Sequence, residues 1–168
     1  FIFMPVFGLN NGMVPIISYN YGAARPDRVW KTVRLTIFTA VGIMCLGFLA
    51  FQTIPDVLLS LFDASAEMTA IGVPALRTIS ISFLLAGFCI IAGSVCQAIG
   101  NPLYSMVVSV CRQLVVLLPA AWLLSRTGRL ELVWWSFPIA EIASVTLSTI
   151  FLRRTVRSAN ARMKGLKN

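Results

Sequence analysis

The sequence predicts an all-α integral membrane protein with five transmembrane helices, and three observations support this fold class. Hydrophobic residues make up 58% of the 168 residues and charged residues only 12%, whereas soluble domains carry about 25% charged residues. The mean hydropathy of +0.84 requires that much of the apolar surface faces lipid. Cutting the chain at its charges leaves neutral windows of about 20 residues, the length with which a helix crosses about 30 Å of hydrocarbon.

Each neutral window predicts one helix, because a segment in lipid must satisfy its backbone hydrogen bonds internally. The connections are short, and Gly100-Asn101-Pro102 forms the tightest of them, with helix-stop followed by helix-start residues. A basic tail over 156–168 follows the last helix. The predicted helices cover about 1–22, 29–54, 67–99, 102–125 and 132–154.

The first predicted helix is interrupted by polar residues and helix breakers. Its glycines and Pro15 predict a broken or wet middle, whose free carbonyl groups line a water-filled cavity. Gly8 and Gly12 also form a GxxxG pair, which is typical of close helix packing, so both interpretations stay open. The candidates for a hinge or a packing role are Gly8, Gly12, Pro15 and Gly22. The same helix supplies two polar pathway candidates, Tyr19 and Asn20.

The distribution of basic residues predicts the orientation in the membrane. The net charge is +8, and ten of the 14 Lys and Arg residues lie in the 22–34 connection or after residue 152. Only Arg126 and Arg129 lie in connections on the opposite side. By the positive-inside rule the protein is a multi-pass protein of the plasma or inner membrane with a cytoplasmic C-terminus. The positive charge therefore indicates topology and contact with membrane lipid rather than binding of nucleic acid.

The composition also argues against an enzyme and against a metal site. The chain contains no His, which removes the commonest general base and every Ser-His-Asp arrangement. Its four Cys residues lie in apolar runs without a CxxC pair, which indicates small core residues rather than disulfides or zinc ligands. No cofactor is expected.

Glu141 is the only acidic residue inside a predicted span, about 14 Å below the outer end of its helix at 1.5 Å per residue. A charge at that depth costs about 2.5–3.5 kcal/mol, so such residues usually face a bundle interior or a wet cavity. Arg112, about 21 Å deep on the preceding antiparallel helix, is its natural partner. Glu141 is interpreted either as a proton carrier or as a structural carboxylate that braces Arg112. Two further polar candidates are Gln113, beside that pair, and Gln97, near the end of the third helix.

Several stretches together resemble one family. The segment GLNNGMVPIISYNYGA at 8–23 resembles the eighth membrane helix of multidrug and toxic compound extrusion (MATE) transporters. Further matching stretches follow in the same order as in that family: ALRTIS at 75–80, QAIGNP at 97–102, CRQL at 111–114 and WSFPIAE at 135–141. This resemblance covers nearly the whole chain.

The resemblance implies a fold and a function. MATE transporters have twelve helices in two six-helix lobes, so residues 1–155 correspond to helices eight to twelve, most of the C-terminal lobe. Helix seven and the N-terminal lobe would be further parts of the same polypeptide. Members export cationic or amphiphilic compounds in exchange for H⁺ or Na⁺ by alternating access. The alternatives are a lipid-linked oligosaccharide flippase of the same superfamily and a structural membrane subunit that does not transport.

Overall fold

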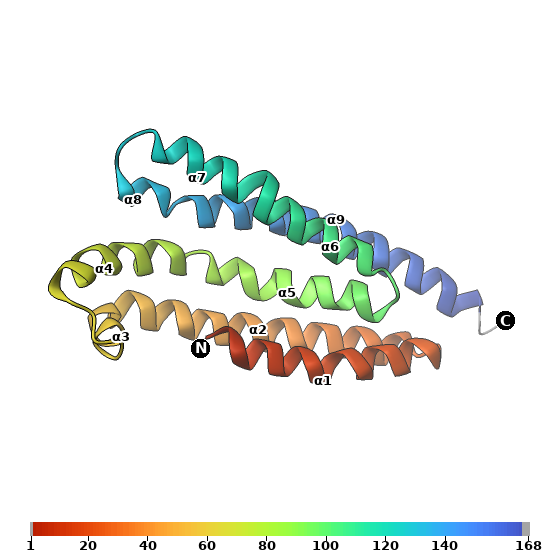
Figure 1. The fold of residues 1–168 in the computed structure, drawn as a ribbon. Helices are drawn as coiled ribbons and strands as arrows, with labels where there is room; N and C mark the ends of the chain where they lie inside the picture. Colours follow the sequence, from red (N-terminus) through yellow and green to blue (C-terminus); the bar gives the residue numbers. More distant parts are fainter. Residues whose placement is uncertain (1, 166–168) are drawn as a thin grey trace.

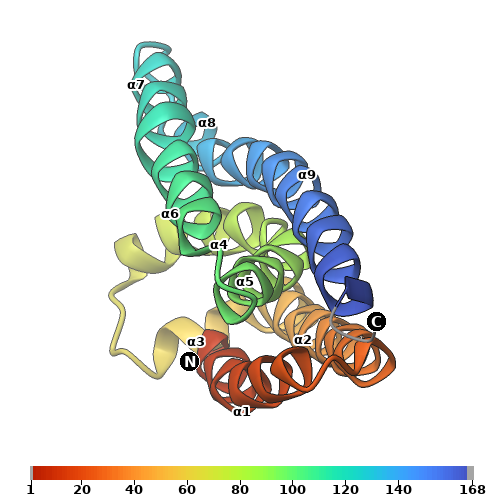
Figure 2. The ribbon, with the colours of Figure 1, turned by 90° about the vertical axis from the view of Figure 1, so that its right-hand side faces the viewer.

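The computed structural model describes residues 2–165, which form a bundle of helices (Figure 1). Helix α5 lies at the centre of the bundle and contacts α1, α2, α6 and α9 (Figure 2). The elements are α1 (Phe3–Gly22), α2 (Pro26–Thr53), α3 (Pro55–Ser60), α4 (Ala66–Ser80), α5 (Phe83–Ala98), α6 (Pro102–Val110), the π-helix η1 (Cys111–Leu117), α7 (Leu118–Ser125), α8 (Leu130–Val133) and α9 (Ser136–Gly165).

Within the described range, three helical stretches are long and apolar enough to cross a membrane: Pro26–Thr53, Pro102–Ser125 and Leu130–Gly165. Helices α4 and α5 pass the same test together as one span bent by 50°. Helix α1 has 20 residues but does not pass it, because its Asn, Ser and Tyr residues lower its hydropathy. Its position against α2 and α5 nevertheless makes it part of the bundle (Figure 2).

The span expected as one helix over 67–99 is bent at Ile81 and Ser82, so the prediction of one continuous helix was wrong. The Ser80 and Ser82 hydroxyl groups donate hydrogen bonds to the carbonyl groups three residues earlier, and such back-bonding bends helices. Gln52 of α2 donates to the Arg77 carbonyl at 2.8 Å and to Ser80 Oγ at 3.0 Å. The freed polar groups are thus satisfied from a neighbouring helix.

The span over 102–125 is also not a uniform α-helix as expected, because residues 111–117 widen into the π-helix η1. Pro119 explains the difference. It has no N–H to donate to the Val115 carbonyl, and its ring crowds that carbonyl in a regular α-helix. The preceding N–H of Leu118 instead reaches back five residues to the Gln113 carbonyl.

The first helix has no broken middle: α1 runs without interruption from Phe3 to Gly22 with Pro15 inside it. It buries one face, which includes Val6, Met13 and Ile17, against α2 and α5. Its glycines lie away from that face. No atom of the described residues lies within 4 Å of a Cβ placed on Gly8, Gly12 or Gly22, so the expected GxxxG packing has no partner within this part of the chain.

The last helix continues well beyond the predicted end at 154. Helix α9 extends to Gly165, and Thr155, Ala159 and Met163 are buried in the bundle. Trp30 at the start of α2 donates a hydrogen bond through Nε1 to Asn160 Oδ1 at 2.7 Å. The described part of the expected tail is therefore a docked helix, whereas 166–168, like Phe1 of the first predicted helix, lie outside the described residues.

Both basic segments lie at the same end of the bundle. The α1–α2 connection and the C-terminal end of α9 meet there, and the α5–α6 turn lies beside them (Figure 1). A hydrogen bond of 3.0 Å from Ser18 Oγ to the Ala98 carbonyl joins α1 to α5 at this end. Gly100, in the turn, has a φ of 95°, which favours glycine.

Candidate functional site

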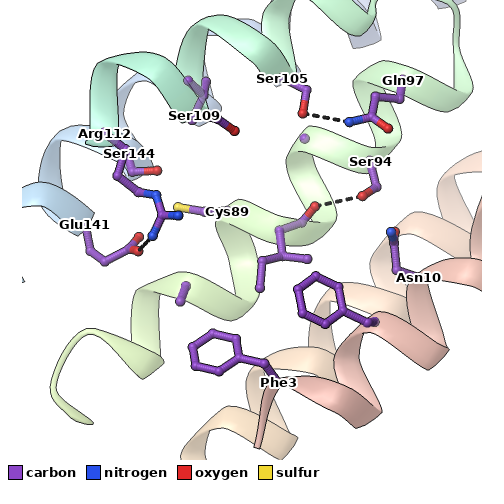
Figure 3. Close-up of a pocket in the computed structure, with 15 residues that line it drawn as sticks. Phe3, Asn10, Cys89, Ser94, Gln97, Ser105, Ser109, Arg112, Glu141 and Ser144 are labelled. Carbon is purple, nitrogen blue, oxygen red and sulfur yellow. Dashed lines mark hydrogen bonds and ion pairs between the residues drawn. The ribbon is translucent and has the colours of Figure 1, made fainter. Parts of the chain in front are cut away.

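A polar cavity of about 380 Å³ lies between α1, α5, the α6–η1 span and α9 (Figure 3). Phe3 and Phe7 of α1 line one side of it. The cavity combines apolar surface with polar groups that converge from different helices, as ligand sites do. The polar lining residues are Asn10, Cys89, Ser94, Gln97, Ser105, Ser109, Arg112, Glu141 and Ser144.

An ion pair between η1 and α9 borders this cavity. Arg112 Nη1 donates to Glu141 Oε1 at 2.9 Å, which is the pairing expected from the depths of the two residues. The Glu141 side chain is 6% exposed, whereas the Arg112 side chain is 45% exposed. The carboxylate is thus held in the bundle interior, while the guanidinium group has further N–H groups that face the cavity (Figure 3).

Several buried side-chain oxygen atoms of α1 and α9 have no nitrogen or oxygen partner among residues 2–165, and the Cys89 thiol lies close to those of α9. They include Glu141 Oε2, Ser144 Oγ and Ser148 Oγ of α9 and Asn10 Oδ1 of α1. Buried polar groups in proteins almost always have a partner. A cavity of this volume with polar walls has room for water molecules or a polar ligand that satisfies these atoms. The arrangement can therefore hold a hydrated ion or a polar group beside a carboxylate.

Arg112, in the wide turn of η1, lines this cavity. A π-helical turn changes the angular position of every residue before it relative to an α-helix, and such turns frequently occur at functional sites. Ser105, Ser109 and Arg112 all line the cavity, at the spacing i, i+4 and i+7. The span therefore presents one polar face to α5 and α9.

The other predicted site residues divide into two groups. Gln97 lines the cavity and donates to Ser105 Oγ at 2.8 Å. Gln113 lines an adjacent cavity of about 240 Å³ that also touches Arg112 and Glu141. Asn20 is buried elsewhere, with Nδ2 donating to the Ile16 carbonyl at 2.8 Å. Tyr19 is 75% exposed on the outer face of α1 and does not line the cavity.

The hinge and packing candidates also lie away from this site. Gly8, Gly12, Pro15 and Gly22 belong to the outer part of α1 and do not line the cavity.

Sequence reasoning did not identify Cys89 and Ser144 as lining residues. Cys89 was expected to be a small core residue, but its sulfur points toward the Arg112–Glu141 pair (Figure 3). The sequence signal that could have identified Ser144 is its helical spacing from Glu141. Ser144 and Ser148 lie three and seven residues after Glu141, and residues at that spacing share a helix face.

Within residues 2–165 no cluster of three or more His, Cys, Asp or Glu side chains is arranged to hold a metal ion. Glu141 is the single acidic group in the cavity lining. Any ion there would be bound by this carboxylate together with hydroxyl and amide oxygens.

Long apolar helices around a polar, partly charged cavity define a lobe of a helical membrane transporter. The comparison with known proteins is consistent with that class. The MatE family profile matches residues 1–123, and the chain belongs to this family of multidrug and toxic compound extrusion transporters. The family indicates a transporter rather than an enzyme.

Curated relatives are named as multidrug export proteins. The multidrug export protein MepA of Staphylococcus saprophyticus subsp. saprophyticus is 26% identical over 136 residues, which cover 81% of this chain and 30% of the relative. MepA of Staphylococcus haemolyticus is 24% identical over 143 residues, with 85% and 31% covered. The chain thus spans about a third of the length of these relatives.

Solved structures share the fold. The MATE multidrug transporter DinF-BH superposes with a TM-score of 0.83 at 34% identity, covering 91% of this chain and 34% of that one. An inward-facing MATE family transporter gives a TM-score of 0.86 at 18% identity, with 95% and 38% covered. An outward-facing one gives 0.85 at 19% identity, with 95% and 36% covered. The all-helical chain is therefore a lobe fragment of a MATE transporter.

Proposed function

We propose that this chain forms helices eight to twelve of a secondary active multidrug efflux antiporter. The complete polypeptide would add helix seven and the N-terminal lobe, and would export cationic or amphiphilic compounds in exchange for H⁺ or Na⁺. The printed function of the MepA relatives, multidrug export, and their roughly threefold greater length support this proposal. The basic end of the bundle supports a cytoplasmic C-terminus in the plasma membrane.

The observation that carries the proposal is the state of the Glu141 carboxylate. Its Oε1 accepts from Arg112, while Oε2 is buried beside the cavity with no nitrogen or oxygen partner among the described residues, and the weakly donating Cys89 thiol lies next to the carboxylate. In the proposed cycle Oε2 takes the coupling ion, H⁺ or Na⁺. The bound ion neutralises the carboxylate and weakens its attraction for Arg112, because the Coulomb energy depends on both charges. Release of the ion restores the pair.

Alternating access requires a flexible element that couples this change to the helices. The α6–η1–α7 span carries Arg112 within its π-helical turn, and the opposing α4–α5 span is bent by 50°. Both spans therefore have an irregular segment about which their halves can move. The relatives' fold has been solved in inward-facing and outward-facing conformations, which supports a cycle of this kind.

The test is drug export by the complete polypeptide in a host that lacks its own efflux pumps. Wild type, Glu141→Gln and Arg112→Ala are compared at equal expression under imposed H⁺ and Na⁺ gradients. Glu141→Gln removes the charge and keeps the shape, so we expect export that no longer responds to either gradient. Glu131→Gln, on exposed α8, is the matched control and should export like wild type.

Two outcomes contradict the proposal. Unchanged gradient-driven export by Glu141→Gln would remove this residue from coupling. Wild-type export at the same rate with and without the H⁺ and Na⁺ gradients would exclude an antiport mechanism.

The half-exposed Arg112 guanidinium favours a second candidate, a flippase for an anionic lipid-linked oligosaccharide. Among the described cavity-lining residues it is a single cation, whereas a pyrophosphate-linked cargo calls for several. Loss of oligosaccharide translocation with unaffected drug export in Arg112→Ala would favour the flippase.

A further inference from the structure

The exposed face of α9 carries a basic cluster near the end of the membrane-spanning part. Arg153, Arg154 and Arg157 surround a hollow of about 250 Å³ together with Ile150. All three arginines are exposed. Within residues 2–165 the sole ion pair is Arg112–Glu141, so no described carboxylate neutralises this cluster.

The cluster continues a stripe of exposed residues along the same helix. Ile142, Thr146 and Ile150 are exposed at four-residue intervals, and the arginines follow one helical turn later. The opposite face of α9, with Glu141, Ser144 and Ser148, is buried in the bundle. The stripe is uncovered in this part of the polypeptide and is apolar enough to face lipid, and the arginines follow it about 20 residues after the start of the span, the length that crosses the hydrocarbon.

We propose that this hollow binds the phosphate headgroup of an anionic phospholipid, with an acyl chain along Ile150 and Ile142. Guanidinium groups bind phosphate oxygens through pairs of parallel N–H donors, which lysines do not offer. Basic pockets at the membrane face of helical proteins bind anionic headgroups in this way. The apolar stripe selects a lipid rather than a free phosphate ion.

Four other arginines of the described residues lack this combination. Arg25 and Arg28 share their hollow with Asp27, which lowers its local charge. Arg126 lies over the Trp122 ring at 4.2 Å, and Arg112 pairs with Glu141. The α9 hollow joins three guanidinium groups, no acid and an adjoining apolar stripe.

The test uses the complete polypeptide, purified in detergent and titrated with phosphatidylglycerol or phosphatidylcholine, with bound lipid counted by native mass spectrometry. The first variant replaces all three arginines by lysine, which keeps the charge and the membrane topology. The second replaces them by glutamine. The matched control, Arg25→Gln/Arg28→Gln/Lys31→Gln, removes the same charge from the same end of the bundle.

We expect one tightly held phosphatidylglycerol in wild type and in the control. Its apparent affinity should fall by roughly tenfold to a hundredfold in the glutamine variant, because three basic groups leave the headgroup. The lysine variant should fall between these two. Phosphatidylcholine should bind weakly to all four proteins.

Three outcomes overturn the proposal. Equal losses in the glutamine variant and the control would show that bulk charge alone attracts the lipid. Full binding by the lysine variant would remove the role of the guanidinium geometry. Displacement of the lipid by millimolar inorganic phosphate would make the site a phosphate site. If the glutamine variant elutes as an aggregate, the comparison of phosphatidylglycerol affinity between the lysine variant and the control tests the proposal.

Discussion

The bundle has two sides that share α5 and differ in how they are packed. Where α1 packs against α2 the interior is apolar, with Ile17, Val29 and Met44 buried completely, and we call this the dry side. On the side of η1 and α9 the interior contains the cavity and the Arg112–Glu141 pair. Three of the five buried unpartnered side-chain atoms within residues 2–165 belong to α9.

Helix α5 shows how one sequence serves both sides. Ile91, Val95 and Ile99, at four-residue intervals, belong to the apolar core. Cys89, Gly93 and Gln97, offset by two residues, line the cavity. Since two residues turn an α-helix by about 200°, the two series point in opposite directions. The dry side is suited to act as a support, and the side of η1 and α9, which we call the wet side, contains the groups to which the proposed function assigns ion binding.

The largest expected effect comes from breaking the ion pair on the wet side. Arg112→Ala leaves the buried Glu141 carboxylate without its partner, and because the Arg112 side chain is 45% exposed we expect the free energy of unfolding to fall by about 2–4 kcal/mol, less than for a fully buried pair. Unfolding of the complete polypeptide in detergent–SDS mixtures measures this change. Arg112→Ala/Glu141→Gln should recover most of the loss, and a double variant no more stable than the single one would contradict the pairing.

A cavity on the dry side should cost nearly as much. Met44→Ala removes a fully buried side chain from between α2 and α5, and we expect a loss of about 2–4 kcal/mol in the same unfolding assay. Leu46→Ala, two residues away on the exposed face of α2, is the control and should change stability by less than about 0.5 kcal/mol. Equal effects of the two substitutions would mean that the dry side is not closely packed.

The contact that closes the basic end should contribute less. Trp30→Phe keeps one aromatic ring but removes the five-membered part of the indole with the N–H that donates to Asn160 Oδ1, so a loss of at least about 1 kcal/mol is expected. The same small loss should appear in Asn160→Ala and should not double in the combined variant. Additive losses would show that the two side chains do not depend on each other.

The smallest expected change in stability distinguishes a serine hydroxyl group without a hydrogen-bond partner from one that has two. Ser144 Oγ has no protein partner among the described residues, so Ser144→Ala should alter unfolding by less than about 0.5 kcal/mol. Ser80 Oγ accepts from Gln52 and donates to the Arg77 carbonyl, so Ser80→Ala should cost about 1 kcal/mol. A costly Ser144→Ala would indicate that the cavity water or ligand contributes to stability.

The sequence was sufficient to predict the helical class, the order of the spans and the proximity of Arg112 to Glu141. Hydropathy and helical rise carry that information, because both depend on position along the chain alone. The site was predicted only in part: Arg112, Glu141 and Gln97 line the cavity, but Asn20 and Tyr19 do not. Polar composition marked α1 as unusual without indicating which of its faces meets α5.

The local irregularities depend on competition between hydrogen bonds, which hydropathy does not report. Pro119 was visible in the sequence, but a proline kinks, widens or ends a helix according to its neighbours. The serines at the α4–α5 bend do not by themselves predict it. The bend also depends on Gln52 of another helix, which donates to the Arg77 carbonyl and to Ser80 Oγ. Likewise, the charges after residue 152 indicated a tail, while Thr155, Ala159 and Met163 had the spacing of a buried helix face.

The length of α9 gives the protein a mechanical connection. Glu141 and Arg157 lie on one uninterrupted helix, 16 residues and about 24 Å apart at 1.5 Å per residue. A tilt of this rod that opens the cavity at one end must swing the arginine cluster at the other. Under the two proposals above, lipid bound at those arginines would oppose this tilt, and transport by the complete polypeptide would then depend on membrane composition.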